Sequence, residues 1–374
     1  MAEFCTGRNV FEASLERVRW CFDNFDEVIV NVSGGKDSTI CLELAIMVAK
    51  EKNKLPVKVM WLDQECEWQE TVDYVDEVMR RKEVKPYWFQ FEFDFTNSLS
   101  NQKNFVKLWD ETKKDKWVHP KSDISIKTNP TKENRFHKLI SALHYPMLEP
   151  TTKNAVVLIG MRCEENINRR KAIMYCRSKN RIKPWIAKCD TKIKEAYPIY
   201  DWTFDDVWIA LCKNQWKYNK VYDQFYKWGV PKSRFRVSAM IHETAYWQIE
   251  YLQEIEPKTY DRFCNRINGV DCYSHSFENK SVQIKELPYM FKDWKEYRDY
   301  LLVHLVKKEY WDLFKERWKD QNDDKWYKVH ITEVLANDID GTKNRNTIGQ
   351  RSYDERAIEK KKILKSLINK GEIR

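Results

Sequence analysis

Six residues from Ser33 to Ser38, with the sequence SGGKDS, combine the residue types that hold a phosphate group. The two adjacent glycines let the backbone approach a ligand closely because they carry no Cβ atom. Lys36 supplies a positive charge, and Ser33 and Ser38 supply hydroxyl donors. A carboxylate beside a phosphate is repulsive unless it caps a helix or faces a cation, so Asp37 indicates a divalent metal ion such as Mg²⁺.

The sequence on either side of this segment predicts how it is positioned. Residues 27–32 form an apolar run typical of a buried strand, and residues 39 to about 52 follow the pattern of a helix. The start of a helix favours an anion because its first backbone N–H groups are unpaired and its dipole is positive there. The spacing differs from the GxxxxGK[ST] loop of kinases and GTPases, since the lysine follows the glycines immediately. An ordinary capped glycine turn is the alternative, but a strand before and a helix after favour a phosphate-binding loop.

Four sequence blocks in a fixed order resemble one known family. The SGGKDS segment resembles the PP-loop of the adenine nucleotide α-hydrolases, which include phosphoadenosine phosphosulfate (PAPS) reductases, the ATP sulfurylase small subunit and ATP pyrophosphatases. Residues 61–71 (WLDQECEWQET), 159–169 (IGMRCEENINR) and 197–208 (YPIYDWTFDDVW) are similar to the blocks that follow in PAPS reductases. A glycine usual in the second block is missing, and Asn166 stands where serine is usual in the third. The resemblance implies an α/β fold of the HUP type, with a doubly wound and mainly parallel sheet.

The second and third blocks place polar residues at the ends of two predicted strands. Asp63 follows the strand predicted at 57–62, where open α/β sheets bind ligands, although an aspartate there can also cap a helix. Arg162 and Arg169 follow the strand predicted at 155–158 and form a natural clamp for a sulfate or phosphate, whereas most surface arginines are simply solvated. The predicted nucleotide contacts are Ser33, Gly34, Gly35, Lys36, Asp37, Ser38, Asp63, Gly160 and Glu165. The predicted catalytic residues are Lys36, Asp37, Arg162 and Arg169, and the predicted Mg²⁺ ligands are Asp37 and Asp63.

The fourth block is interpreted mainly as architecture. Thr203 is followed three residues later by Asp206, which is the pattern of a helix capping box. The neighbouring Trp202 and Trp208 are expected in the core rather than on a ligand. The stretch from Tyr218 to Tyr222 extends the same block.

The cysteines argue against an iron–sulfur cluster. PAPS reductases carry a nucleophilic cysteine in a C-terminal Glu-Cys-Gly segment, and the assimilatory adenosine phosphosulfate (APS) branch adds paired cysteines for a cluster. The ten cysteines here are scattered from Cys5 to Cys272 without a CxxC pair, so no cluster is expected. Cys163, Cys264 and Cys272 remain candidates for a reactive thiol, with a buried and inert state as the alternative for each.

The resemblance extends to a sub-branch of PAPS reductase-like proteins with an extra C-terminal domain, called DUF3440 proteins. Bacterial and phage genomes commonly place these beside a ParB/sulfiredoxin-like protein, which is therefore the expected protein partner. Unpaired cysteines suit a reducing compartment, and neither a signal-peptide pattern nor an apolar run near the ~20 residues of a membrane span is visible. The cytoplasm is the expected location, without membrane contact. The aromatic content of 14% suits core packing or a subunit interface, and we expect a homo-oligomer.

Length and charge predict a two-part chain. Residues 1–230 are expected to form the nucleotide-binding domain, with an insertion at about 97–132, and residues 231–374 a mostly helical domain. The net charge of +9 is concentrated in two stretches: residues 162–194 hold 11 Lys and Arg against 3 Asp and Glu, and residues 342–374 hold 10 against 4. The first stretch extends the field of the anion site. The second is a basic tail that either docks on a domain or partner or contacts nucleic-acid phosphates.

The sequence thus predicts a protein that binds an adenine nucleotide. The favoured activity is attack on the α-phosphorus of ATP with release of pyrophosphate, which adenylates an unknown substrate with the help of Mg²⁺. One alternative is thiol-dependent reduction of PAPS or APS. Another is a nucleotide sensor without enzymatic activity that regulates through a protein partner.

Overall fold

A computed structural model describes residues 9–97, 99, 105–174, 182–188, 192–242, 245, 247–270, 286–335 and 338–339. The chain divides into two compact units. Unit 1 comprises Met1–Thr96 and Phe105–Asp271, and unit 2 comprises Asn97–Asn104 and Cys272–Arg374. Unit 1 therefore continues past residue 230, where the sequence analysis put the boundary between its two domains.

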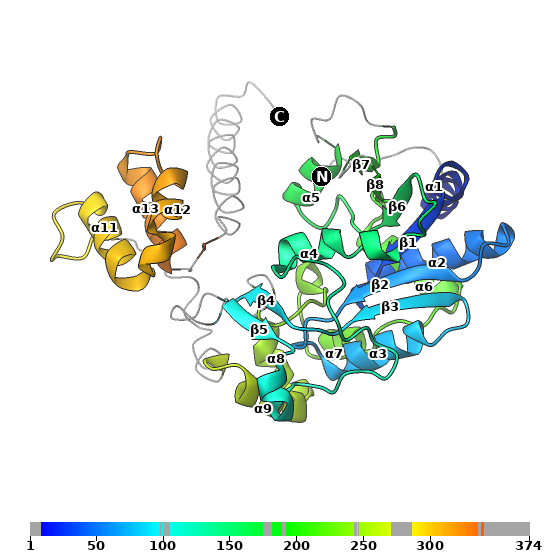
Figure 1. Cartoon of the computed structure of the whole chain (residues 1–374), viewed down its shortest axis with the longest axis horizontal. Helices are drawn as coiled ribbons and strands as arrows, with labels where there is room; N and C mark the ends of the chain where they lie inside the picture. Colours follow the sequence, from blue (N-terminus) through cyan, green and yellow to red (C-terminus); the bar gives the residue numbers. More distant parts are fainter. Residues whose placement is uncertain are drawn as a thin grey trace, which may run out of the picture. The chain divides into compact units, whose positions relative to one another are not determined.

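Unit 1 is built on a six-stranded sheet with the strand order β3-β2-β1-β6-β8-β7 (Figure 1). Strands β3, β2, β1, β6 and β8 pair in parallel with one another in that order, whereas β7 pairs antiparallel with β8. A mainly parallel sheet with flanking helices confirms the predicted fold class. The strands span Glu27–Asn31 (β1), Val57–Leu62 (β2), Val84–Phe89 (β3), Ala155–Leu158 (β6), Ile186–Lys188 (β7) and Ile193–Ala196 (β8).

The strand order reverses direction beside β1. From β1 the chain adds β2 and β3 on one side, and later adds β6 and β8 on the other. Residues Glu27 to Val30 of β1 pair in register with Ala155 to Leu158 of β6. Open sheets bind ligands at such a reversal, in the crevice beyond the carboxyl ends of the strands. The loops that follow β1 and β6 are therefore where a ligand is expected.

Four helices supply most of the apolar side chains that cover this sheet. Helix α2 (Lys36–Glu51) is buried along most of its length and packs on α1 (Val10–Asn24) and α6 (Phe204–Lys213). Helix α3 (Gln69–Met79) packs against β3, and its Val72, Val75, Val78 and Met79 join the same core. Strands buried on both faces read as continuous apolar runs, which is why residues 27–32 were recognisable from the sequence.

The segment between β3 and β6 contains the predicted insertion. Strands β4 (Phe93–Thr96) and β5 (Phe105–Leu108) form a separate antiparallel pair. They are followed by the 3₁₀ helix η1 (Glu111–Lys116), helix α4 (Phe136–Ala142) and the 3₁₀ helix η2 (Tyr145–Met147).

The remaining elements of unit 1 are helices, and residues after β8 contact the loops that follow the strands. These helices are α5 (Ile167–Met174), α7 (Val221–Lys227), η3 (Lys232–Arg234), α8 (Gln248–Ile255) and α9 (Pro257–Arg266). The carboxylate of Glu256 accepts hydrogen bonds from the backbone N–H groups of Gln69 and Glu70, at 2.8 and 3.1 Å. Helix α3 therefore obtains its N-terminal cap from a residue far along the chain.

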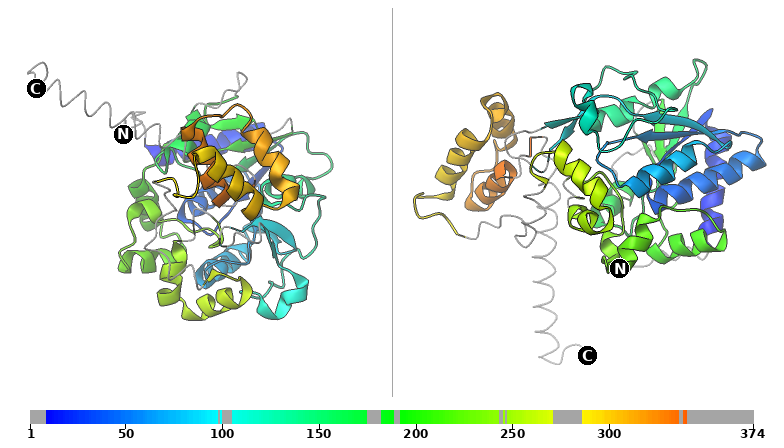
Figure 2. Two further views of the ribbon diagram at one scale, coloured as in Figure 1. Left: turned by 90° about the vertical axis from the view of Figure 1, so that its left-hand side faces the viewer. Right: turned by 90° about the horizontal axis from the view of Figure 1, so that it is seen from below.

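Unit 2 is mostly helical over its described residues, as predicted for the C-terminal region. Helix α11 (Trp294–Leu305) packs on α13 (Asp324–Leu335), with η4 (Lys308–Tyr310) and α12 (Trp311–Arg317) between them in sequence. Figure 2 shows these helices from two further sides. The predicted basic tail at 342–374 and Cys272 lie outside the described residues. Among the helices that the structure describes, none is long and apolar enough to cross a membrane.

Candidate functional site

The glycines of the PP-loop, residues 33–38, are required by its backbone. Gly34 has a φ angle of +68°, and a Cβ atom there would lie 2.5 Å from Cγ2 of Thr71. Gly35 is the N-cap of α2, which begins at Lys36 rather than at Thr39 as the sequence predicted. Four backbone N–H groups at the start of a helix have no partner within the helix. The loop thus joins β1 to a helix start suited to an anion.

The loop is held in shape by its own serines. Ser38 Oγ donates to the carbonyl oxygen of Gly35 at 2.9 Å and accepts from the backbone N–H of Ser33 at 3.2 Å. The two serine hydroxyl oxygens are 3.4 Å apart. Both predicted serine contacts therefore shape the loop.

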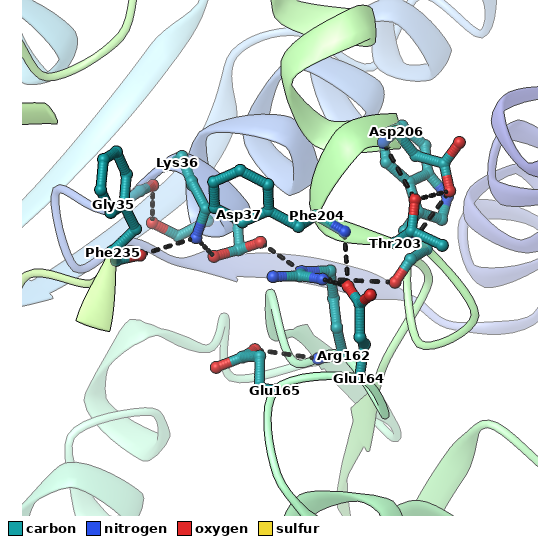
Figure 3. Close-up of polar contacts among 12 residues, drawn as sticks. Gly35, Lys36, Asp37, Arg162, Glu164, Glu165, Thr203, Phe204, Asp206 and Phe235 are labelled. Atoms are coloured by element: carbon teal, nitrogen blue, oxygen red, sulfur yellow. Dashed lines mark hydrogen bonds and ion pairs between the residues drawn. The ribbon is translucent and has the colours of Figure 1, made fainter. Parts of the chain in front are cut away.

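Asp37 joins two cations at the end of the loop (Figure 3). Its Oδ2 accepts from Lys36 Nζ at 2.7 Å, and its Oδ1 accepts from Arg162 Nε at 2.6 Å. Lys36 Nζ also donates to the carbonyl oxygen of Phe235 at 3.0 Å. Burial alone would raise the pKa of the Asp37 carboxyl, but Lys36 and Arg162 hold it below its ordinary value. Three of the four predicted catalytic residues thus form one ion-paired chain.

Glutamates position the two predicted arginines. Arg162 Nη1 donates to Glu164 Oε2 at 2.9 Å, and the same oxygen accepts from the backbone N–H of Phe204. Glu165 Oε1 accepts from the backbone N–H of Arg162 at 3.1 Å, while its Oε2 pairs with Arg169 Nη1. Glu165, which the sequence predicted as a nucleotide contact, therefore orients the arginine clamp.

Gly160 brings the end of β6 against the PP-loop. A Cβ atom at this position would lie 2.6 Å from the backbone carbonyl of Asp37 and from the backbone nitrogen of Ser38. Contacts this short do not occur between a Cβ and backbone atoms, so only glycine permits the approach. Gly160, which was predicted as a nucleotide contact, allows the end of β6 to pack closely against the PP-loop.

Asp63 belongs to a different network. Its side chain is fully buried, and Oδ2 accepts from Trp88 Nε1 at 3.0 Å and from Gln90 Nε2 at 2.8 Å. Oδ1 accepts from the backbone N–H of Glu65 at 2.9 Å and lies 3.4 Å from His119 Nε2. With both oxygens occupied in this way, Asp63 is a poor ligand for an incoming ion. Among the described residues, no three His, Cys, Asp or Glu side chains gather where they could hold a metal ion.

Two residues that the sequence analysis assigned only to architecture also support the loop. The hydroxyl of Tyr222 accepts from the backbone N–H of Lys36 at 3.3 Å. Asn219 Nδ2 donates to the carbonyl oxygen of Gly34 at 3.0 Å and to Thr71 Oγ1 at 2.8 Å. Both side chains are buried. The sequence signal that could have indicated their role is their position in the stretch that extends the fourth block.

Arg236 is a site residue that sequence reasoning missed. Its side chain is half-buried and, among the described residues, forms no hydrogen bond or ion pair. Burial and the nearby Arg169 lower its pKa, and the negative charges that oppose this shift are those of Glu165 and Asp37. Arg236 is thus a cation near the PP-loop that forms no ion pair with another described residue.

Comparison with known proteins supplies the family. The model of the phosphoadenosine phosphosulfate reductase domain matches residues 27–229, which is more than half of the chain. The chain belongs to the PAPS reductase family. This match spans all four sequence blocks from which the resemblance was predicted, and it agrees with nucleotide binding.

The PAPS reductase-family chain is also similar to individual proteins. It is 27% identical over 320 residues to "Uncharacterized protein YbdN" of Escherichia coli (strain K12), covering 80% of this chain and 76% of that protein. The solved PAPS reductase of Candida auris, in a phosphate complex, is 17% identical with a TM-score of 0.34 over 57% of this chain and 84% of that one. The FMN adenylyltransferase of Candida glabrata with ATP is 14% identical with a TM-score of 0.36 over 57% of each chain.

Proposed function

We propose that this chain binds ATP at the PP-loop and promotes attack of a substrate nucleophile on its α-phosphorus. A bond forms between the nucleophile and that phosphorus while the bond to the bridging oxygen of the leaving pyrophosphate breaks. The nucleophile's proton passes to solvent, and the products are pyrophosphate and an adenylated substrate. Such a reaction needs mainly positioning and neutralisation of charge.

The observation that carries this proposal is the excess of positive charge around the PP-loop after its ion pairs are counted. Lys36 and Arg162 are paired with Asp37, Arg162 is also paired with Glu164, and Arg169 is paired with Glu165. Arg236 adds a further cation without a partner among the described residues. A guanidinium held partly out of water is costly unless an anion joins it. A polyphosphate supplies that anion.

Each residue has a proposed role in this reaction. The backbone N–H groups at the start of α2 hold the pyrophosphate, together with Lys36. Arg162 and Arg236 neutralise charge that develops on the α-phosphate and the leaving group. Arg169 completes the clamp from α5.

Of the two predicted magnesium ligands, we propose Asp37, which lies in the loop and would release its ion pair with Lys36 or Arg162 to hold Mg²⁺. Its carboxylate is a hard oxygen donor within the loop, and Mg²⁺ is usually held by one or two carboxylates together with substrate phosphates. Bound there, Mg²⁺ would reduce the negative charge of those phosphates. The carboxylate of Asp63 already has four contacts in its own network, so we do not propose it as a ligand.

The family match favours a second candidate, binding of PAPS or APS followed by thiol-dependent reduction. That chemistry requires a thiolate. Cys163 is buried, and this burial raises the pKa of its thiol, so it is a poor nucleophile. Cys264 is half-buried and Cys272 lies outside the described residues, so this argument applies to Cys163 alone, and adenylation is the activity that we propose. The non-enzymatic sensor, the ParB/sulfiredoxin-like partner, the DUF3440 branch, homo-oligomerisation and a cytoplasmic location stay predictions.

Calorimetric titration with ATP, APS and PAPS in the presence of Mg²⁺ tests the proposal. Wild type is expected to select ATP, and Lys36→Ala is expected to weaken ATP binding about tenfold or more, because a charge-assisted contact contributes roughly 1.5–3 kcal/mol. Lys50→Ala is the matched control, since Lys50 is exposed on the same helix α2. Selective binding of PAPS or APS would transfer support to the reductase candidate. Binding of none of the three would refute both.

A further inference from the structure

A positively charged recess lies in unit 1 and shares no residue with the PP-loop. Its volume is about 550 Å³, which is within the usual range for small-ligand sites. Two separate segments form it: residues 111–127, which comprise η1 and the loop that follows it, and helix α9. Its lining residues are Glu111, Lys114, Trp117, His119, Pro120, Lys121, Lys127 and Arg262.

Positive charge predominates in this recess. Lys114, Lys121, Lys127 and Arg262 face a single carboxylate, that of Glu111. Lys114 and Lys127 are exposed, and within the part of the chain that the structure describes neither side chain forms an ion pair. Charges of one sign gathered in a hollow attract a ligand of the opposite sign.

Two of the cations are held in place. The side chain of Lys121 is only 7% exposed, because its ammonium pairs with Glu111 Oε1 at 2.5 Å and lies 4.5 Å from the centre of the Trp117 ring. Arg262 Nη1 donates to the carbonyl oxygen of Val118 at 3.4 Å. An ordinary solvated lysine face does not fix its ammonium groups in this way.

The floor of the recess is also rigid. His119 is buried, and its ring packs edge-on against Trp109, with the ring centres 5.1 Å apart. Its Nδ1 lies 3.2 Å from the carbonyl oxygen of Pro120 and its Nε2 lies 3.4 Å from Asp63 Oδ1. A ligand therefore meets positioned cations above a packed aromatic base.

We infer that this recess binds a small anion that carries several phosphoryl groups. Four cations against one carboxylate are matched by a polyphosphate rather than by a single carboxylate ligand. The cations converge from two segments, residues 111–127 and α9, on one hollow instead of following a track, which favours a compact anion over a nucleic-acid strand. The site is independent of the reaction proposed for the PP-loop.

Inorganic pyrophosphate is the probe, titrated calorimetrically into the full chain. The charge-reversal pair Lys114→Glu with Lys127→Glu removes the two exposed cations without disturbing a described ion pair. We expect this variant to lose one of the binding equivalents of wild type, with affinity at that site reduced about tenfold or more. Lys36→Ala is expected to retain that equivalent, which separates this site from the PP-loop. The control, Lys132→Glu with Lys138→Glu, makes the same change in net charge at exposed lysines outside the recess.

Three results would overturn the inference. In the first, all pyrophosphate binding disappears in folded Lys36→Ala. In the second, the control pair weakens binding as much as the recess pair, which would show a general field effect. In the third, a short single-stranded oligonucleotide without terminal phosphates requires Lys114 and Lys127 by fluorescence anisotropy, while pyrophosphate does not.

Discussion

Replacing the single side chain of Arg236 is expected to change the stability of the protein and its affinity for ATP in opposite directions. Replacing it by Met keeps the length of the aliphatic stem and removes the charge. We expect Arg236→Met to increase the free energy of unfolding by about 1 kcal/mol, since a half-buried cation without a partner among the described residues is lost. We expect the same variant to weaken ATP binding, because in the proposed function the Arg236 guanidinium pairs with the phosphates of the nucleotide. Urea unfolding and calorimetry measure the two quantities.

Arg234→Met is the control for this pair of effects. Arg234 lies over the ring of Trp247, with 5.5 Å from its guanidinium carbon to the ring centre. The Arg234→Met substitution should leave the affinity for ATP unchanged. If Arg236→Met were destabilising and bound ATP normally, Arg236 would have to be a structural residue.

His144 makes the stability of unit 1 depend on pH. Burial lowers the pKa of its imidazole to about 4, and its Nε2 lies 3.0 Å from Asn31 Oδ1 at the end of β1. A pKa below the ordinary value of 6.5 means that the folded state favours the neutral ring, so its contribution is present above pH 6.5 and is lost as the pH falls toward 4. The loss is at most about 3 kcal/mol for this group.

Urea unfolding at pH 7 and pH 4.5 measures this dependence. His144→Gln, which retains a donor for Asn31, is expected to lose less stability on acidification than wild type. His137→Gln is the matched control because His137 is exposed. An equal loss in wild type and His144→Gln would show that other groups cause the acid sensitivity.

The sequence predicted the site's residue types better than their partners. It named Lys36, Asp37 and Arg162, which the structure brings together. It could not show that Asp63 is occupied by Trp88 and Gln90, because hydrogen bonds between distant segments leave no local pattern. Arg236 was missed for the same reason: an arginine outside the four blocks carries no signal until its spatial neighbours are known.

At the level of elements, the contact between β6 and the PP-loop depends on Gly160. Gly160→Ala places a Cβ against backbone, which cannot swing aside like a flexible side chain. We expect a loss of about 1–3 kcal/mol in the free energy of unfolding, as for other overpacked sites. ATP affinity should fall as well, because the displaced backbone is that of Asp37 and Ser38. Thermal unfolding and calorimetry provide the test.

Gly229→Ala distinguishes a site effect from simple destabilisation. Gly229 has a φ of +67°, and a Cβ added there would meet nothing within 4 Å, so its substitution costs about 1–2 kcal/mol of backbone strain without a clash. ATP affinity should be retained in this variant. Retained affinity in Gly160→Ala would mean that the loop tolerates the displacement.

Local rules predicted some element boundaries well. The capping box at Thr203 is confirmed: Thr203 Oγ1 accepts from the backbone N–H of Asp206 at 3.2 Å, and Asp206 Oδ2 accepts from the backbone N–H of Thr203 at 2.8 Å. Helix α2 begins earlier than predicted because its cap is the backbone of Gly35 rather than a side chain. The cap that Glu256 provides for α3 lies too far away in sequence for any local rule.

For the whole molecule, the order of the four blocks was enough to predict a mainly parallel sheet. It did not predict that the compact unit extends to Asp271, since the contacts of α8 and α9 with earlier segments have no sequence signature. Every described residue of the candidate site lies in unit 1. A chain that ends at Asp271 is therefore expected to bind ATP with unchanged affinity.

Calorimetry on this shortened chain checks the expectation, with circular dichroism to establish that it is folded. A folded but non-binding product would assign part of the nucleotide site to residues after 271. The segment Asn97–Asn104, which groups with unit 2, is retained in the shortened chain.

The hydrogen bond from Lys36 to Phe235 also has a consequence for biosynthesis. The two residues are 199 positions apart, so a ribosome releases the PP-loop long before it makes the carbonyl that anchors its lysine. Chains are synthesised at roughly 5–20 residues per second, which leaves the loop without this anchor for at least about 10 seconds. A translation product interrupted before Phe235 therefore carries the PP-loop sequence without the assembled anion site.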